Sequence, residues 1–563
     1  MKYYTNKYML PTIILLFIIF ITELFSFGVS NTKHNLSVSG PGQIKATSEQ
    51  EVCIFCHAPH NAARTPLWNK PNSFATYTLY TSPTKNAIIG QPDGNSIYCL
   101  SCHDGTIALG TVSNKSTQIN FGAITTLVGS GNLGTDLSND HPISFIYDAA
   151  IVSTNGQLVQ PSLLGLGNLL ENGKVQCTSC HDPHSSSYTS FLKVTSQNSA
   201  LCITCHSKTG WANSTHYSSA NTWNGSGTNP WFHTPSTYKT VQSNGCENCH
   251  NPHNAGKPSN LLNFGMDNDN CMVCHNGNGA SKNIQAEVSK SYKHDVAASS
   301  NNGIHSPAEN NLVGTQHVAC VDCHNPHQSN ASVSIAPNVN GFTTGVKGVT
   351  SSGIDITPAL FEYQICNRCH STSTWRPASR TTRQVASNNI MQEFNTKNAS
   401  YHPIIDNKSS TTDMPSLISP WTSSSIMKCS DCHASDGTDA PKGPHGSNYP
   451  SILKKQYVTT DNTIESQSNY ALCYDCHSRT SILGDVSFSL HSKHINDVKA
   501  PCNICHDPHG VNSTSINNGR LINFNTNIVT PYNGVLAWTP KGTRSGSCQL
   551  TCHNKSHNPL NYP

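Results

Sequence analysis

Cysteine and histidine residues at a fixed spacing are the main chemical feature of this 563-residue chain. All 24 cysteines occur in pairs, and a histidine directly follows each pair. Eleven pairs have the spacing Cys-x-x-Cys-His, whereas the twelfth, Cys548-Gln-Leu-Thr-Cys552-His553, has one more residue between its cysteines. The regular pairs are Cys53 with Cys56, Cys99 with Cys102, Cys177 with Cys180, Cys202 with Cys205, Cys246 with Cys249, Cys271 with Cys274, Cys320 with Cys323, Cys366 with Cys369, Cys429 with Cys432, Cys473 with Cys476 and Cys502 with Cys505. Their histidines are His57, His103, His181, His206, His250, His275, His324, His370, His433, His477 and His506.

This spacing predicts covalent attachment of haem c. Two thiols three residues apart on a helical turn face the same side, so both can form thioethers with the vinyl groups of one porphyrin. The next residue then lies under the iron and supplies its proximal imidazole. We therefore predict twelve haems, with Cys548–Cys552 as the irregular site.

Three other uses of paired cysteines are weaker explanations. Disulfides suit an exported protein and an even cysteine count, but they do not require a histidine after every pair. A closed zinc site needs a second ligand pair at a fixed distance, whereas these pairs are 25 to 78 residues apart. Thioredoxin-like chemistry would use one such motif on a βαβ scaffold, which this sequence lacks.

The motifs form six repeats of two. The first motif of a repeat usually reads CHxPH, and the two leading cysteines are 46, 25, 25, 46, 44 and 46 residues apart in successive repeats. The fifth repeat departs from this pattern, with a longer loop before His445. We predict repeats at residues 31–170, 171–240, 241–317, 318–425, 426–499 and 500–563.

Composition predicts an unusual fold. Only 12% of residues are charged and 36% hydrophobic, so the polypeptide has few side chains for a large apolar core. We expect mostly coil and turns, short α-helical segments that carry the motifs, a few short β-hairpins within residues 104–176 and 371–428, and haems in a chain as the core. The net charge of +3, without basic clusters, argues against binding to nucleic acid.

The N-terminus has the pattern of an export signal. Lys2 and Lys7 precede an apolar run at residues 12–22, and small residues follow at 28–30. We predict a signal peptide over residues 1–30. An uncleaved anchor is the alternative, although Glu23 interrupts the run well short of the roughly 20 residues that span a bilayer. The mature chain should contain no membrane span and should reside in the periplasm or on the outer cell surface.

The motifs and their pairing resemble the doubled-CXXCH multihaem cytochromes of metal-reducing and related anaerobic bacteria. The resemblance extends from about residue 50 to 557. It implies periplasmic or outer-surface electron transfer through bis-histidine haems packed in a chain. Some members of this broad class form filaments, so the resemblance also implies that copies of this chain can assemble with one another.

Each low-spin iron needs a sixth ligand, which we expect to be histidine. Only five methionines follow the signal, whereas seventeen histidines remain beyond the proximal twelve. The CHxPH histidine lies on the proximal side of its own haem and can reach only a neighbouring one. We predict that one such set ligates adjacent irons: His60, His184, His253, His327, His445 and His509. A second predicted set follows the other motifs: His141, His233, His305, His402, His494 and His557.

The choices within the second set leave alternatives open. His216 competes with His233, His294 or His317 with His305, and His491 with His494. His34 could also reach the first repeat.

The predicted function is electron transfer along low-potential haems, without bond chemistry. Its partners would be other redox proteins or an extracellular electron acceptor. The alternative is a multihaem oxidoreductase that reduces nitrogen or sulfur oxyanions at one iron with an open coordination position. All twelve motifs end in histidine and spare histidines outnumber the irons, so we favour the electron-transfer protein.

Overall fold

The computed structural model describes residues 28–60, 67–163, 169–296, 317–372, 379–407 and 413–563. Most of the predicted signal peptide and the predicted ligand His305 lie outside these residues. In the described part, no helix combines the length and the apolar character needed to cross a bilayer.

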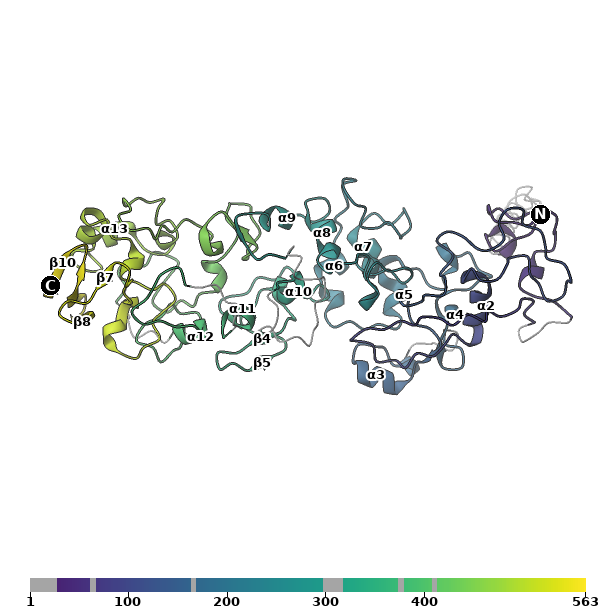
Figure 1. Cartoon of the computed structure of the whole chain (residues 1–563), viewed down its shortest axis with the longest axis horizontal. Coiled ribbons are helices and arrows are strands. Elements are labelled where there is room, and N and C mark those ends of the chain that lie inside the picture. The colour runs from purple at the N-terminus through teal and green to yellow at the C-terminus, as the bar shows by residue number, and fades with distance from the viewer. Residues whose placement is uncertain (1–27, 61–66, 164–168, 297–316, 373–378, 408–412) are drawn as a thin grey trace, which may run out of the picture. The chain divides into compact units, whose positions relative to one another are not determined.

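Helices are short and joined by long stretches of coil (Figure 1). The longest, α2 and α11, each carry a motif near their C-terminal ends. The α-helices are α2 Gly94–His103, α3 Ala149–Asn155, α4 Cys177–Cys180, α5 Ala200–Ile203, α6 Thr215–Ser218, α7 Val241–Asn244, α8 Asp269–His275, α9 Ile284–Glu287, α10 Cys320–Cys323, α11 Glu362–His370, α12 Ile390–Glu393 and α13 Arg479–Leu483. This confirms the expectation of a coil-rich fold with short helices at the motifs.

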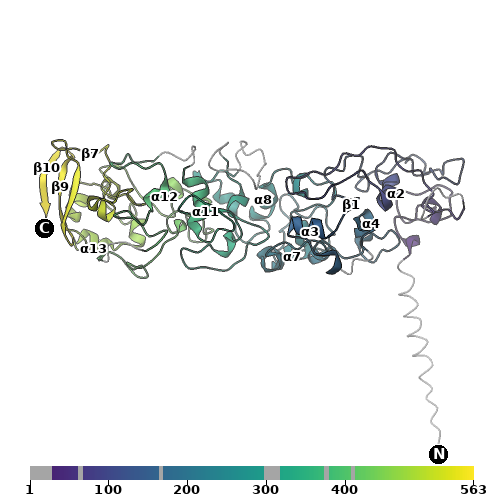
Figure 2. The same cartoon turned by 90° about the horizontal axis from the view of Figure 1, so that it is seen from below.

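Strands form small antiparallel sheets. The two-residue pairs are β1 Phe145–Ile146 with β2 Lys174–Val175, β3 Tyr292–Lys293 with β6 Gly446–Ser447, and β4 Gly348–Val349 with β5 Asp355–Ile356. The larger sheet is C-terminal, where β9 Ser545–Cys552 pairs with β7 Val529–Thr530, β8 Ala537–Gly542 and β10 Lys555–Tyr562 (Figure 2). The pair β1–β2 lies in the first interval predicted for hairpins. In the described part of 371–428 there is no strand, and sequence analysis did not predict the C-terminal sheet.

The chain divides into two compact units. The first comprises residues 1–211, 217–222 and 229–265, and the second comprises 212–216, 223–228 and 266–563. The first unit contains the motifs from Cys53 to His250, and the second contains those from Cys271 to His553. The six-repeat division stays a prediction.

Apolar clusters within the units are small. In the second unit, one cluster has seven buried residues: Ala500, Ile504, Phe524, Val529, Trp538, Leu550 and Tyr562. In the first unit, the cluster around Phe55, Leu109 and Phe121 has six buried residues. The polypeptide therefore provides local cores only, as the composition predicts.

Candidate haem sites

Eleven cysteine pairs lie at helical turns. Their first cysteines lie in α2, α4, α5, α8, α10 and α11, or on the 3-10 turns Cys53–Phe55, Gly245–Asn248, Cys429–Asp431, Cys473–Asp475 and Cys502–Ile504. The amide of the trailing histidine donates to the carbonyl of the first cysteine, at 2.8 Å for His57 and 3.1 Å for His250. This turn places both thiols on one side and the imidazole beside them, as thioether attachment requires.

The helical segments do not always include both cysteines of a motif. In the Cys246 motif the 3-10 turn ends at Asn248, and Cys249 follows it with φ of −124° and ψ of −22°. The Cys249 amide still donates to the Cys246 carbonyl at 3.2 Å, so the turn that joins the two cysteines is closed by a hydrogen bond. The second cysteine also follows the last helical residue at Cys56, Cys205, Cys432, Cys476 and Cys505. A short turn is sufficient here because the motif spans only five residues.

The second thiol of most motifs lies in surroundings that disfavour a thiolate. None of the 24 cysteines, all of which the structure describes, forms a disulfide. Burial raises the pKa of Cys180 and of Cys432 to about 12. A zinc site needs deprotonated sulfur, whereas a thioether carries no charge, so these environments suit haem attachment better than zinc.

Nine proximal histidines face a second imidazole at a nearly constant distance. The ring centres lie 6.0 to 6.3 Å apart, too far for a direct hydrogen bond between the rings. Two imidazole nitrogens on one metal ion each lie about 2 Å from it, and the ring centres about 1 Å further out, so a shared ion requires about 6 Å. The pairs, proximal residue first, are His57–His184, His103–His34, His181–His253, His206–His141, His275–His216, His324–His445, His370–His294, His433–His509 and His506–His491.

Hydrogen bonds set the tautomer of these imidazoles. Nδ1 of His103 lies 2.6 Å from the carbonyl oxygen of Gly131, and Nδ1 of His324 lies 2.8 Å from that of Phe342. Because a carbonyl only accepts, Nδ1 carries the proton and Nε2 keeps its lone pair for a metal. Burial, with a smaller contribution from His141, lowers the pKa of His206 to about 3, which favours the neutral form that ligation needs.

A recurring loop supplies several of these carbonyls. In four first motifs, the residue that accepts the Nδ1 proton has a left-handed backbone conformation with φ between 56° and 65°. The acceptors are Ser190 for His181, Asn260 for His250, Ser451 for His433 and Arg520 for His506, at 2.8 to 2.9 Å. The signal in the sequence was the recurring apolar stretch after these residues, such as Phe191-Leu192-Lys193, whose role sequence analysis did not identify.

The CHxPH proline also has a structural role. Its carbonyl accepts the Nδ1 proton of a histidine that pairs with the second motif of another repeat. This bond joins His216 to Pro326 at 3.2 Å and His294 to Pro444 at 2.8 Å. A proline carbonyl thus orients one histidine of a pair, and His445, which follows Pro444, faces a different motif histidine, His324.

The structure brings four of the six predicted CHxPH-type ligands to a proximal histidine. These are His184, His253, His445 and His509. His60 is exposed and pairs with no imidazole of the described residues. The prediction for His327 stays a prediction.

In the second predicted set, the structure favours several of the alternatives. His141 pairs with His206, and His402 lies close enough to His477 for their charges to interact. His275, however, faces His216.

His233 instead points its Nε2 at the backbone carbonyl of His250, at 3.2 Å. The alternative His294 pairs with His370 and the alternative His491 with His506, whereas the predicted ligand His305 lies outside the described residues. His34 pairs with His103. Spacing could not separate these choices because the two candidates of each pair lie between the same two cysteine motifs.

Thiols of consecutive motifs lie close together within each unit. Between repeats, the first cysteines are hydrogen-bonded, as in Cys99–Cys177, Cys202–Cys246, Cys271–Cys320, Cys366–Cys429 and Cys473–Cys502. Within repeats, the second cysteines are near neighbours, as in Cys56–Cys102, Cys180–Cys205, Cys323–Cys369, Cys432–Cys476 and Cys505–Cys552. Motifs adjacent in sequence are therefore adjacent in space in each unit.

The third repeat is not part of this series. Its second cysteines are Cys249, which belongs to the first unit, and Cys274, which belongs to the second. For Cys249 and Cys274 the thiol contact within the repeat is therefore not described, and their haem-binding roles stay predictions that depend on the motif of each cysteine alone.

Comparison with known proteins agrees with this geometry. Residues 170–210, 239–280 and 425–481 match the family described as the doubled CXXCH motif. These doubled motifs identify the chain as a multihaem c-type cytochrome. No curated protein matches the chain. The doubled motifs of the cytochrome indicate electron transfer through covalently bound haem.

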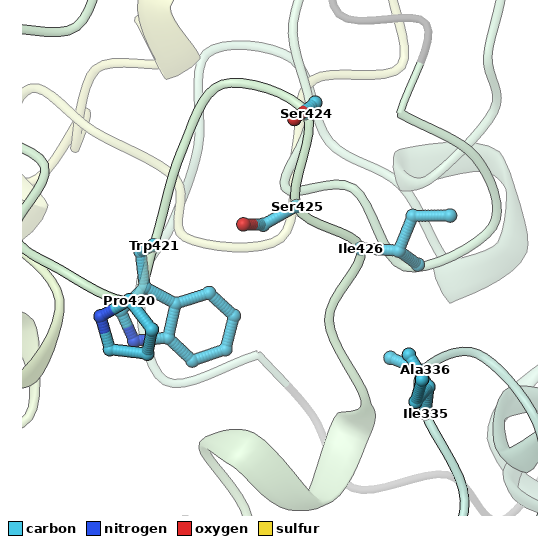
Figure 3. A pocket seen from close by; sticks show the side chains of 7 residues that line it. All are labelled: Ile335, Ala336, Pro420, Trp421, Ser424, Ser425 and Ile426. Carbon is cyan, nitrogen blue, oxygen red and sulfur yellow. The ribbon is translucent and has the colours of Figure 1, made fainter.

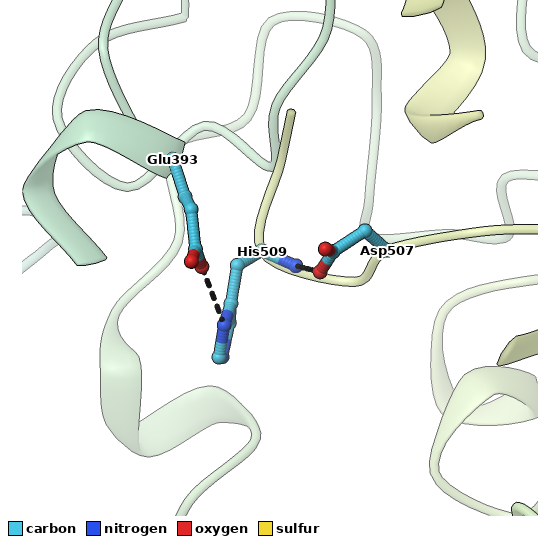
Figure 4. A group of neighbouring side chains, drawn as sticks. All are labelled: Glu393, Asp507 and His509. Carbon is cyan, nitrogen blue, oxygen red and sulfur yellow. Dashed lines mark hydrogen bonds and ion pairs between the residues drawn. The ribbon is translucent and has the colours of Figure 1, made fainter. Parts of the chain in front are cut away.

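Two of the paired histidines of the cytochrome have a carboxylate partner in place of a carbonyl. Nδ1 of His509 lies 3.1 Å from Oε2 of Glu393, and the His509 amide donates to Asp507 at 3.4 Å (Figure 4). Burial is the largest single effect on the pKa of His509 and lowers it, but the hydrogen bond and charge of Glu393 together with the charge of Asp507 outweigh it, so that this pKa is raised. Nδ1 of His253 lies 2.9 Å from Oδ1 of the buried Asp140. These carboxylates increase the electron donation of the imidazole to a bound metal.

One surface pocket of the cytochrome has no haem-binding chemistry. It measures about 360 Å³ and contains neither cysteine nor histidine (Figure 3). Its lining is Ile335, Ala336, Pro420, Trp421, Ser424, Ser425 and Ile426.

Proposed function

We propose that this cytochrome is an exported electron carrier with twelve haems, most or all of them ligated by two histidines. The observation that carries this proposal is the set of nine imidazole pairs with ring centres 6.0 to 6.3 Å apart. Bound haem iron supplies one-electron redox chemistry, and two neutral imidazoles keep its potential low.

The residues of the chain perform three tasks. The thiols fix each cofactor covalently, the imidazoles fill both axial positions, and the Nδ1 acceptors hold the imidazoles in the ligating tautomer. With both axial positions filled by protein, a substrate has no open metal position, so this arrangement favours electron transfer over reduction of an oxyanion.

The thiol contacts support an electron path in motif order. In the first unit, the path runs from the Cys53 motif to the Cys246 motif, and in the second it runs from the Cys271 motif to the Cys548 motif. We propose that electrons are exchanged with other redox proteins or with an extracellular acceptor, in the periplasm or on the outer surface, after export by the segment at residues 1–30.

The test is spectroscopic and uses the full-length holoprotein. We expect only low-spin ferric bands, no carbon monoxide binding after reduction, and midpoint potentials mostly below zero millivolts. A high-spin ferric band together with carbon monoxide binding in the wild-type protein would instead support the oxyanion-reductase alternative.

A further inference from the structure

The C-terminal motif folds differently from the other eleven. Cys548 and Cys552 both lie on strand β9, and His553 follows at the turn into β10 with φ of 48°. Residues an even number apart on a strand face the same side, and the next residue faces the opposite side. Cys548 and Cys552 therefore face one side of the sheet, whereas His553 lies in the turn beyond the end of the strand.

The contacts of His553 show where the two nitrogens of its ring lie. Its Nδ1 is 3.7 Å from Sγ of Cys552. Its Nε2, the atom that binds iron in a regular motif, lies 2.9 Å from both carboxylate oxygens of Asp461. In the part of the chain that the structure describes, no other histidine ring faces His553. Nε2 of His553 thus contacts the Asp461 carboxylate instead of facing a second imidazole, as the ring does in the regular sites.

Another histidine lies on the side of the cysteines. Cys548 and Cys552 pack against the cluster that contains Leu550 and Tyr562. His557 on β10 lies directly opposite Leu550 in the strand register, is only 7% exposed, and its Nδ1 is 2.9 Å from the Tyr562 hydroxyl. If Nδ1 donates to this hydroxyl, Nε2 of His557 is available as a ligand.

A second ligand for the same site is also present. His494 lies near His557, and its ring centre is 5.8 Å from that of Tyr562. Its Nδ1 lies 2.7 Å from the carbonyl oxygen of Leu490, the arrangement that leaves Nε2 free in the regular sites. Its neighbour His491 already faces His506.

The position of His494 in the sequence fits this role. Histidines that face the second motif of a repeat precede that repeat, as His141, His216 and His294 do. His494 holds the corresponding position before the sixth repeat.

We propose that His494 and His557, rather than His553, are the axial ligands of the C-terminal haem. The proposal rests on the proposed function, because it assumes that the Cys548–Cys552 pair carries a haem. Attachment adds the sulfur and hydrogen of a thiol across a vinyl double bond, so atoms balance and no net oxidant is needed. His553 is then a positioning residue that ties the hairpin turn to Asp461.

The experiment compares His553→Ala with His557→Ala in the full-length holoprotein, by haem count from intact mass and by carbon monoxide binding to the reduced protein. We expect His553→Ala to stay fully low-spin, and His557→Ala to bind one carbon monoxide per chain. His557→Met serves as a second variant, because it keeps a ligand and should raise one midpoint potential without carbon monoxide binding.

Two results would overturn the proposal. In the first, His553→Ala binds carbon monoxide and His557→Ala does not, while His557→Met leaves every midpoint potential unchanged. The other is a wild-type mass with eleven haems, which leaves the electron-transfer function intact and corrects only its haem number. Loss of the proposed function would look different, since the eleven regular sites would then lack haem or bind carbon monoxide.

Discussion

The Glu393 carboxylate should lower the potential of the site formed by His433 and His509. Oxidation to the ferric state makes the Nδ1 proton of His509 more acidic, so its bond to Glu393 strengthens more in the oxidised than in the reduced form. A hydrogen bond to a charged group contributes about 1.5–3 kcal/mol. The side chains of Glu393 and His509 are 15% and 34% exposed, so solvent weakens the difference between oxidation states, which we place at about 1 kcal/mol. For one electron this corresponds to about 40 mV.

Replacement Glu393→Gln keeps the size of the side chain and removes its charge. We expect one midpoint potential to rise by about 40 mV and the others to stay in place. The measurement is a potentiometric titration followed by a method that resolves individual haems, such as NMR of the haem methyl groups. Asp497→Asn is the matched control, because it removes one negative charge from a different position of the same unit. The reasoning is refuted if no potential moves in Glu393→Gln, if one falls, or if the control gives the same shift.

Three further predictions use other parts of the molecule. Asp140→Asn should raise a second single potential by a similar amount, because its carboxylate contacts a ligand in the same way; the same titration measures it, and an unchanged set of potentials would contradict it. His216→Ala should open one iron to carbon monoxide while His233→Ala opens none, and the reverse result would show that the ligand assignment is wrong. Lys70→Met should reduce the free energy of unfolding by about 2–4 kcal/mol, because the buried ammonium donates to the carbonyls of residues 108, 109 and 111; an unchanged denaturant midpoint would contradict this.

The sequence predicts the haem-binding chemistry of this cytochrome better than it predicts which histidines face one another in the folded chain. The cysteine spacing is set by local geometry on one helical turn, so it could be interpreted without tertiary structure. The coil-rich fold also follows from composition, and the structure confirms it. How far each helical segment extends was less predictable, since the turn at Cys246 ends one residue before Cys249.

The ligand pairs depend on contacts across long stretches of chain, such as the contact between His34 and Pro183, which are 149 residues apart. Spacing alone could not choose between His216 and His233, since both precede the Cys246 motif. The choice is made by the carbonyl of Pro326, a contact that only the folded chain brings together.

The C-terminal hairpin shows a second limit. Its residues were expected to form a helical turn because their motif resembles the other eleven. The extra residue between Cys548 and Cys552 does not by itself exclude a helix, because residues four apart also lie on one helix face. The contacts that decide the conformation come from outside the motif. Pairing of β9 with three neighbouring strands then favours the extended conformation.

The central claim is that the paired thiols hold haem, and the mass of the denatured full-length holoprotein tests it most directly. Thioether-bound haem survives denaturation, whereas zinc and non-covalent cofactors are lost. We predict a mass above that of the processed polypeptide by twelve haems, with every added mass localised to a cysteine-pair peptide after proteolysis. A mass equal to that of the bare polypeptide, or one lower by the hydrogens lost in disulfide formation, would contradict the account.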